Sequence, residues 1–355
     1  MENEKNNSNS EHRCKFNQHY VFQSYLKAWT DDRNELWEYK RGRQKIVHKG
    51  TTNTLSAYKT YELKDMNDDE LKFFELFMDS LKISKSNKKL LWDHITAYLM
   101  PFRNKDMINL LKTYISVPME HPAYNELKST YDNLCLSIQE AIVNTDEDFF
   151  GDYEKDGKEW FARILNGDLN FYYPELYDVE ENHDYTERDE FITFVCIQYF
   201  RTLEMRGILI RNIQNMIDLS ERIKGYEFDR TNVRAEHILP QASWVFFNIL
   251  STAFISRNAH LTVLKNNTTV PFITSDQPVI NLKYEKNKNP EEFVIYYPIT
   301  PKVAITINDE NRHFSKEIDS KSVIDDYNHK MVDHFNTYLI GNSKEILSGI
   351  VDMYL

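Results

Sequence analysis

Glycine and cysteine are scarce in this 355-residue sequence, and each scarcity excludes a type of site. None of the nine glycines belongs to a G-x-x-x-x-G-K or G-x-G-x-x-G pattern, so no familiar phosphate-binding loop is present. Cys14, Cys135 and Cys196 are odd in number and far apart, which matches neither a disulfide framework nor a C-x-x-C metal site. The motifs H-E-x-x-H and G-x-S-x-G are absent too, so the sequence indicates neither a zincin nor a serine hydrolase of the usual kind.

Long hydrophobic runs are also missing. The longest apolar-rich stretch, 244–255, is too short for a membrane span and is interrupted by Asn248, Ser251 and Thr252. Residues 1–14 are polar, contain no apolar core of the signal-peptide kind, and predict a disordered leader. These features, with the unpatterned cysteines, predict a cytoplasmic protein that does not act at a membrane.

The composition is globular and acidic. Lys and Arg total 43 against 55 Asp and Glu, which gives a formal net charge of −12, and 41% of the residues are hydrophobic. A chain of this length and apolar content can bury a real core. Its negative charge makes a general nucleic-acid coat protein a poor interpretation, although a local basic groove is compatible with it.

Apolar periodicity predicts an α+β fold in a single domain over 15–355. Apolar spacing predicts a short helix over about 15–29, a hairpin over 35–50, and mainly helices from about 68 to 256. The clearest of these helices runs from about 188 to 224 without interruption, and another covers roughly 234–256. Strand-like runs fill about 257–310, and helices return over about 319–355. We expect a helical body with an antiparallel sheet formed by the C-terminal third plus the N-terminal hairpin.

Three segments, in order along the chain, carry a family resemblance. His19–Leu26 (HYVFQSYL) resembles an HYVPxxYLxxF opening, Phe272–Val279 (FITSDQPV) resembles an F-x-TSD-x-PV segment, and Tyr297–Pro301 (YPITP) resembles the YPLSP that follows it. Together they are similar to the bacterial domain-of-unknown-function family 4238 over about 15–345, with Phe22 standing where that family usually has proline. The resemblance implies a small soluble bacterial protein, in some cases of a phage-defence or toxin-like system, and it implies no particular reaction.

The first candidate pair lies in the opening segment. His19 and Gln23 are four residues apart, so on a helix their side chains would share one face. A histidine that titrates near neutrality is a natural general acid or base. The alternative is a buried His–Gln pair that caps the hairpin.

A second candidate is an arginine among apolar residues. The residues at helical spacing along this stretch are Phe194, Ile197, Arg201, Met205 and Ile208. A guanidinium on such an apolar stripe needs a partner, because burying an isolated charge is costly. That partner is either an internal carboxylate or the phosphate or carboxylate of a ligand, which the arginine fork can bind with two hydrogen bonds.

A third candidate is the strand end Thr274-Ser275-Asp276. A carboxylate that leaves a buried strand could bind a metal, orient a histidine or anchor an arginine, and Ser275 could contact substrate. Serine and aspartate also form turns through their own backbone, which Pro278 favours. An ion pair between Asp276 and Arg201 would satisfy both charges without any catalysis.

The fourth candidate is His237. Residues 236–241, EHILPQ, resemble the first strand of certain HNH-type nucleases, in which that histidine activates water beside a metal. Residues 260–267 loosely resemble the later strand of that motif, but 242–256 reads as a helix where the nuclease finger needs a loop. His237 is therefore either a site residue at a helix start or a core or capping histidine. His329 and His334 are set aside, because five residues is poor spacing for one helix face.

These candidates lead to two hypotheses. In the first, the protein is a nuclease-like effector that acts on RNA, or on DNA, in phage defence or a toxin system. His19, His237 and Asp276 would be catalytic; Gln23, Arg201 and Ser275 would bind substrate. Asp276 and His237 would be the ligands if a divalent metal such as Mg²⁺ is used. This hypothesis requires the groups to converge in space. In the second, the same residues are structural, and the chain is a binding or regulatory module with a protein partner or a second copy.

Overall fold

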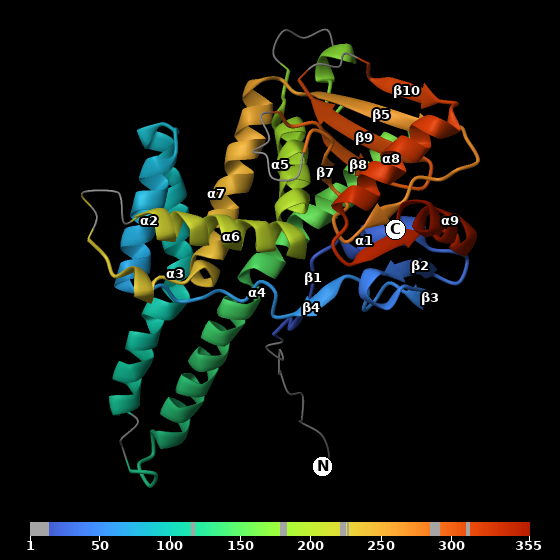
Figure 1. Cartoon of the computed structure of the whole chain (residues 1–355). Coiled ribbons are helices and arrows are strands. Elements are labelled where there is room, and N and C mark those ends of the chain that lie inside the picture. Colours follow the sequence, from blue (N-terminus) through green and yellow to red (C-terminus); the bar gives the residue numbers. More distant parts are fainter. Residues whose placement is uncertain are drawn as a thin grey trace, which may run out of the picture. The chain divides into compact units, whose positions relative to one another are not determined.

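A computed structural model of the chain describes residues 14–114, 118–177, 183–220, 225, 227–284, 292–309 and 313–355 (Figure 1). The polar leader predicted for 1–14 lies outside the described residues, apart from residue 14. The chain divides into two compact units. The helical unit comprises Met1–Gln18, Tyr58–Phe149 and Ile213–Gln241, and the sheet unit comprises His19–Ala57, Phe150–Asn212 and Ala242–Leu355.

The helical unit contains α2, α3, η5 and parts of three helices through which the division between the units passes. Their bounds are α2 (Asp68–Ser80), α3 (Lys85–Tyr114), α4 (Tyr124–Leu165), α6 (Leu203–Leu219), η5 (Arg230–Asn232) and α7 (Ala235–Ser256). Helix α2 begins with a capping box: the Asn67 side chain accepts the Glu70 N–H at 3.0 Å, and the Glu70 carboxylate accepts the Asn67 N–H at 2.8 Å. The aromatic side chains on its inner face, Phe73, Phe74 and Phe77, are fully buried.

The sheet unit contains two sheets. One has the order β10–β5–β9–β8–β7, in which β10 runs parallel to β5 and the other pairs are antiparallel. Its strands are β5 (His260–Asn266), β7 (Ile280–Asn281), β8 (Ile295–Pro298), β9 (Val303–Asn308) and β10 (Ser315–Ile318). The second sheet, in the order β3–β2–β11–β6, is antiparallel throughout. Its strands are β2 (Glu35–Lys40), β3 (Lys45–Gly50), β6 (Thr274–Ser275) and β11 (Tyr338–Gly341).

The remaining elements are short or terminal. They are β1 (Asn17–His19), α1 (Gln23–Leu26), η1 (Lys27–Trp29), η2 (Arg41–Arg43), β4 (Ser56–Tyr58), η3 (Pro174–Leu176), α5 (Thr186–Phe200), α8 (Lys321–His334) and α9 (Lys344–Tyr354). The α+β class is confirmed, and so is the N-terminal hairpin, with η2 at its tip. The hairpin pairs with β11, a strand near the C-terminus that the sequence did not predict.

Two helix predictions around the candidate residues are wrong. His19 ends strand β1, and helix α1 begins only at Gln23, so the two side chains do not share a helix. The helix predicted over 188–224 is interrupted, because α5 ends at Phe200 and α6 starts at Leu203. At the break, the Thr202 hydroxyl accepts the Met205 N–H at 3.4 Å and so caps α6. Arg201 and Thr202 contact residues that are distant in the sequence, as described below. Contacts of this kind leave no periodic pattern in the local sequence, so the break between the two helices could not be predicted from it.

Among the described residues, one helix, α7, is long and apolar enough by composition to cross a membrane, and 56% of its apolar window is buried. A single helix of this kind is weak evidence, because core helices of soluble proteins have the same length and composition.

A close helix contact in the sheet unit gives a first prediction. A Cβ added at Gly157 of α4 would lie 2.5 Å from two ring carbons of Phe194, whereas a Cβ at Gly151 of the same helix would meet no atom within 4 Å. Gly157→Ala should lower the free energy of unfolding by about 1–3 kcal/mol through overpacking. Gly151→Ala should raise it by about 0.5–1 kcal/mol through helix propensity. Urea unfolding of both variants tests this, and a stabilising Gly157→Ala would contradict the packing described here.

Candidate functional site

The three segments that carry the family resemblance meet in the sheet unit. Tyr25, from the opening segment, donates its hydroxyl hydrogen to Oγ1 of Thr274 at 2.5 Å and lies 2.8 Å from the carbonyl of Pro298. The Tyr25 and Tyr297 rings are 5.1 Å apart, and both are fully buried. Burial raises the pKa of the Tyr25 phenol well above its usual value, so it remains a hydrogen-bond donor. These segments therefore form one packed core contact.

Asp276, which directly follows β6, holds a distant turn. Its Oδ1 accepts the N–H of Asn336 at 3.0 Å, and its Oδ2 accepts those of Thr337 at 2.7 Å and Tyr338 at 3.1 Å. The side chain is only 5% exposed, and burial raises the pKa of its carboxyl to about 6, although the three N–H donors act in the opposite direction. Asp276 thus fixes the turn that joins α8 to β11.

The neighbours of Asp276 are also bound by the protein. Ser275 Oγ donates to the carbonyl of Gln277 at 2.9 Å and accepts the Gln277 N–H at 3.0 Å, which forms a local turn. Gln277 Nε2 donates to the carbonyls of Tyr199, at 3.2 Å, and Val279, at 2.7 Å. Its Oε1 accepts the hydroxyl of Thr202. Through these hydrogen bonds, Gln277 links the end of β6 to the break between α5 and α6.

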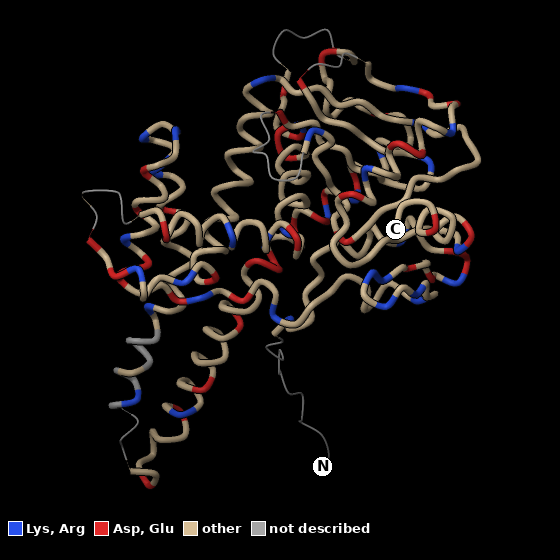
Figure 2. Tube along the Cα trace, in the orientation of Figure 1, with Lys and Arg blue, Asp and Glu red and all other residues tan. Residues whose placement is uncertain are grey.

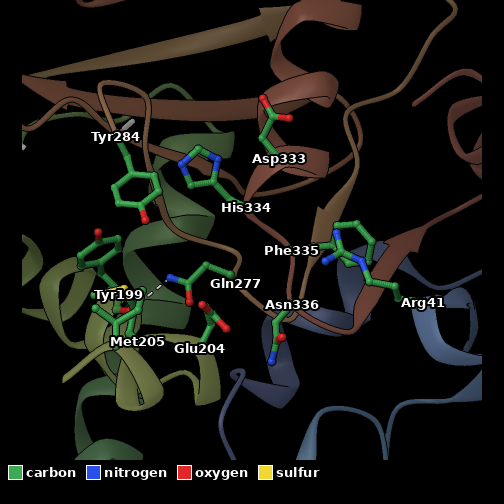
Figure 3. A pocket seen from close by; sticks show the side chains of 11 residues that line it. Arg41, Tyr199, Glu204, Met205, Gln277, Tyr284, Asp333, His334, Phe335 and Asn336 are labelled. Atoms are coloured by element: carbon green, nitrogen blue, oxygen red, sulfur yellow. Dashed lines mark hydrogen bonds between the residues drawn. The ribbon is translucent and has the colours of Figure 1, made fainter. Parts of the chain in front are cut away.

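A cavity of about 220 Å³ lies where these anchored segments meet. Figure 3 shows Tyr199 and Tyr284 on one side of it and Phe335 with Arg41 across from them. The residues of its wall that carry polar groups are Arg41, Tyr199, Glu204, Gln277, Tyr284, Asp333, His334 and Asn336. Concave sites lined by aromatic side chains and convergent polar groups are typical of small-ligand sites.

His334 is the one histidine in the cavity wall. Its Nδ1 lies 2.7 Å from the carbonyl of Lys330, and a carbonyl can only accept, so Nδ1 carries the hydrogen. Nε2 then has the lone pair of the neutral ring; it is enclosed and makes no hydrogen bond within the described part of the chain. Burial lowers the pKa of His334 and favours this neutral form, although the nearby carbonyls of Lys330 and Asn281 act in the opposite direction. Residue spacing did not identify His334, because its role depends on where α8 ends.

Arg201 and His19 lie together in the sheet unit, but their contact does not involve the imidazole. Arg201, at the break between α5 and α6, is 3% exposed. Its guanidinium pairs with Glu154 and donates to the carbonyl of His19, and it lies over the Phe150 ring at 4.7 Å. Its partner is therefore an internal carboxylate, that of Glu154, and not Asp276, which the sequence offered as one possible partner.

The His19 imidazole points to other partners. Its Nε2 lies 3.1 Å from the carbonyl of Thr52, and burial lowers the pKa of the ring. Gln23 is half-buried at the start of α1. The main chain of His19, through its carbonyl, is thus the part that contacts Arg201.

His237 belongs to the helical unit. Its Nδ1 lies 3.0 Å from Oε1 of Glu70, a fully buried carboxylate that also accepts the N–H of Arg234 at 3.1 Å. Since a carboxylate accepts, Nδ1 carries the hydrogen, and Nε2 forms no hydrogen bond to any described residue. The His237 side chain is 25% exposed. Residues 236–241 form the first turns of α7, so the strand that an HNH finger needs is not present here.

The four predicted catalytic or phosphate-binding groups are therefore divided between the units: His19, Arg201 and Asp276 are in the sheet unit, and His237 is in the helical unit. Among the described residues, no group of three or more His, Cys, Asp or Glu side chains is placed to hold a metal ion.

The fold is of the α+β class. The segment 274–277, which carries part of the family resemblance, is buried and is hydrogen-bonded to other parts of the protein. The family model described as "Protein of unknown function (DUF4238)" matches residues 17–349, and the chain belongs to this family. No curated protein and no solved structure matches the chain.

Proposed function

We propose that the protein is a nuclease-like effector that cleaves RNA with His237 as its general base, without the convergence of His19, Arg201 and Asp276 that the first hypothesis required. The observation that carries this proposal is the pairing of His237 with the buried Glu70, which leaves Nε2 without a hydrogen bond to any described residue on a partly exposed side chain. A buried carboxylate that holds one imidazole nitrogen fixes the tautomer and stabilises the imidazolium formed when the other nitrogen takes up a proton.

A phosphate-binding group lies beside the histidine. Arg234 immediately precedes α7; it is exposed, and no described residue pairs with its guanidinium. The N-terminus of a 22-residue helix adds a favourable field for an anion. Of the acidic side chains nearby, Glu70 is bound to His237, and Asp69 is bound to the Asn232 amide at 2.8 Å and to the Asp229 N–H at 3.2 Å, while Glu236 is exposed in the first turn of α7.

The chemistry favours RNA over DNA, because RNA carries its own nucleophile. Nε2 of His237 removes the proton of a 2′-hydroxyl, O2′ attacks the adjacent phosphorus, and the bond to the 5′ oxygen breaks. Water protonates the leaving 5′ oxygen, and the imidazolium returns its proton to solvent. The products are a 2′,3′-cyclic phosphate and a 5′-hydroxyl end, and Arg234 neutralises the charge that develops on the phosphate oxygens.

The setting that we propose is the bacterial cytoplasm, in phage defence or a toxin system, as the family resemblance implies. Cys14, Cys135 and Cys196 are free thiols, which is usual in a reducing compartment.

The test is cleavage of an end-labelled single-stranded RNA, with Mg²⁺ and with EDTA, followed by analysis of the new ends. We expect His237→Ala to reduce the cleavage rate by about 10²- to 10⁴-fold, the usual contribution of a general base. Arg234→Ala should reduce it less, and the matched control His121→Ala, an exposed histidine of the same unit, should leave it unchanged. Equal cleavage by wild type and His237→Ala, or no cleavage by wild type in either buffer, would refute the proposal.

A specific observation also favours a binding or regulatory module. Arg201 and Asp276, which a nuclease would use on substrate, are both buried and bound by groups of the protein itself. In this second candidate function they position the walls of the cavity, and the cavity holds a ligand.

A further inference from the structure

The hairpin of β2 and β3 is basic, although the chain as a whole is acidic. Residues 39–61 include six Lys or Arg and no acidic residue, whereas the net charge of the chain is −12. The tip cations are Lys40, Arg41, Arg43 and Lys45, and no carboxylate of a described residue pairs with any of them. Figure 2 shows Lys and Arg gathered along this hairpin. Such a surface attracts an anion locally, even though the rest of the protein repels one.

Three side chains form a row across one face of the sheet. Lys40 lies directly opposite Lys45 of β3 and directly opposite Tyr338 of β11, and opposite residues of antiparallel strands point to the same face. The Lys40 ammonium lies 5.0 Å from the centre of the Tyr338 ring, and the Lys49 ammonium lies 5.8 Å from it. Lys45 is exposed, and Lys40 and Tyr338 are half-buried. This face therefore presents an aromatic ring beside several cations.

The pairing of Lys40 with Lys45 is unfavourable in the protein alone, because like charges directly opposite each other destabilise a sheet. Further along the hairpin, the cationic groups have acidic neighbours. Lys49 pairs with the buried carboxylate of Glu38 at 2.8 Å, and Nδ1 of His48 lies 3.2 Å from the carboxylate of Glu35. The lack of a carboxylate partner among the described residues is thus confined to the tip cations, where a bound anion would relieve the repulsion.

We propose that this face of the hairpin binds single-stranded RNA, with phosphates on the tip cations and a base against the Tyr338 ring. Contact between a base and an aromatic ring requires a base that is not held in a duplex. A lipid surface fits less well, because none of the highly exposed large apolar side chains of the described chain belongs to 35–50. The choice of RNA over DNA rests on the cleavage proposed above. The binding itself does not involve His237, because the hairpin belongs to the sheet unit.

Fluorescence anisotropy with a short labelled 2′-O-methyl oligouridylate tests the binding. This probe has no free 2′-hydroxyl and cannot be cleaved by the chemistry proposed above, so a failure of binding is distinguished from a failure of cleavage. The logarithm of the affinity should fall with the logarithm of the salt concentration with a slope of about −2 to −3, since each contacted phosphate contributes about −0.7. The same strand in a duplex should bind about fivefold more weakly or less tightly still, because its bases cannot reach an aromatic ring. Equal affinity for strand and duplex, no salt dependence, or tighter binding to phosphatidylglycerol vesicles would overturn the proposal.

Two double variants of equal charge locate the phosphate contacts. Arg43→Ala with Lys45→Ala should reduce the affinity for the probe by about tenfold or more and flatten the salt slope by about 1.4, the contribution of two phosphates. Lys85→Ala with Lys89→Ala is the matched control, because both lysines are exposed at the start of α3 in the helical unit. This control should bind the probe as wild type does. All four positions are exposed, so both variants should fold, and thermal unfolding checks this. Wild-type affinity in the hairpin variant, or an equal loss in both, would overturn the proposal.

The ring contact has its own pair of variants. Tyr338→Leu should reduce the affinity for the single strand by about fivefold or more, the usual effect of removing one stacked ring, and should abolish the preference for the strand over the duplex. Tyr338→Phe keeps the ring and should bind as wild type does. A Tyr338→Leu variant that folds, as judged by thermal unfolding, and keeps wild-type affinity would show that no base lies against this ring and would overturn the proposal.

Discussion

Replacing Asp276 with alanine is expected to lower the free energy of unfolding by about 1–3 kcal/mol, the cost of leaving backbone hydrogen-bond donors without their acceptor. The carboxylate is the acceptor for the N–H groups of Asn336, Thr337 and Tyr338, and alanine would leave all of these donors without this acceptor in a partly buried turn. Urea unfolding measures the effect. Asp333→Ala, in the exposed last turn of α8, is the control and should change stability by less than about 0.5 kcal/mol. A loss below about 1 kcal/mol for Asp276→Ala would contradict the anchoring role.

The same residue gives the stability of the protein a defined pH dependence. The pKa of Asp276 in the folded chain is about 6, above its ordinary value of 3.8, so the folded state binds this proton more tightly than the unfolded state. The stabilising contribution of protonation is complete below pH 3.8 and is lost as the pH rises through 6. An asparagine side chain does not titrate, so the variant Asp276→Asn isolates this effect.

The stability of wild type relative to Asp276→Asn should therefore increase between pH 7.5 and pH 4. The increase should approach about 3 kcal/mol, because each pKa unit corresponds to about 1.4 kcal/mol. The opposite trend, a relative loss of stability in acid, would mean that the three N–H donors outweigh burial and hold the pKa below its ordinary value.

Features that depend on neighbouring residues could be predicted from the sequence. The hairpin at 35–50, strands β5 and β9 and the two C-terminal helices have apolar patterns confined to one short segment, and each is present. The four-residue spacing of His19 and Gln23 was less informative, because such spacing has meaning only if the backbone between them is helical. Here a strand ends at His19, which changes the direction of the chain.

Features that depend on distant contacts could not be predicted. The break between α5 and α6 is set by contacts of Arg201 with Glu154, 47 residues away, and with the carbonyl of His19, 182 residues away. The position of His334 depends on Asp276, which fixes the turn that follows α8. The sequence indicated that Arg201 and Asp276 are unusual, because each is a charged residue within an apolar segment and buried charges are rare. It could not show that their partners belong to the protein itself, because those partners lie far away in the sequence and follow no local pattern.

Replacing Arg201 with methionine is expected to lower the free energy of unfolding by about 3–5 kcal/mol, because it leaves a charge uncompensated in a largely buried site. Glu154, whose side chain is 21% exposed, would lose its only cationic partner among the described residues, and the carbonyl of His19 would lose a donor. Arg201→Lys should be intermediate, since one ammonium group cannot reproduce a fork that contacts both acceptors.

The double variant Arg201→Met with Glu154→Gln separates the ion pair from the shape of the site. Because it removes both charges, it should recover about 0.5–3 kcal/mol of the loss in the single variant, the range of coupling between directly interacting residues. The recovery should persist at high salt, since buried pairs are weakly screened. If Arg201→Met and the double variant unfold at the same urea concentration, the charge pair contributes nothing to the stability of the junction between α5 and α6. Apolar packing alone would then hold this junction in place.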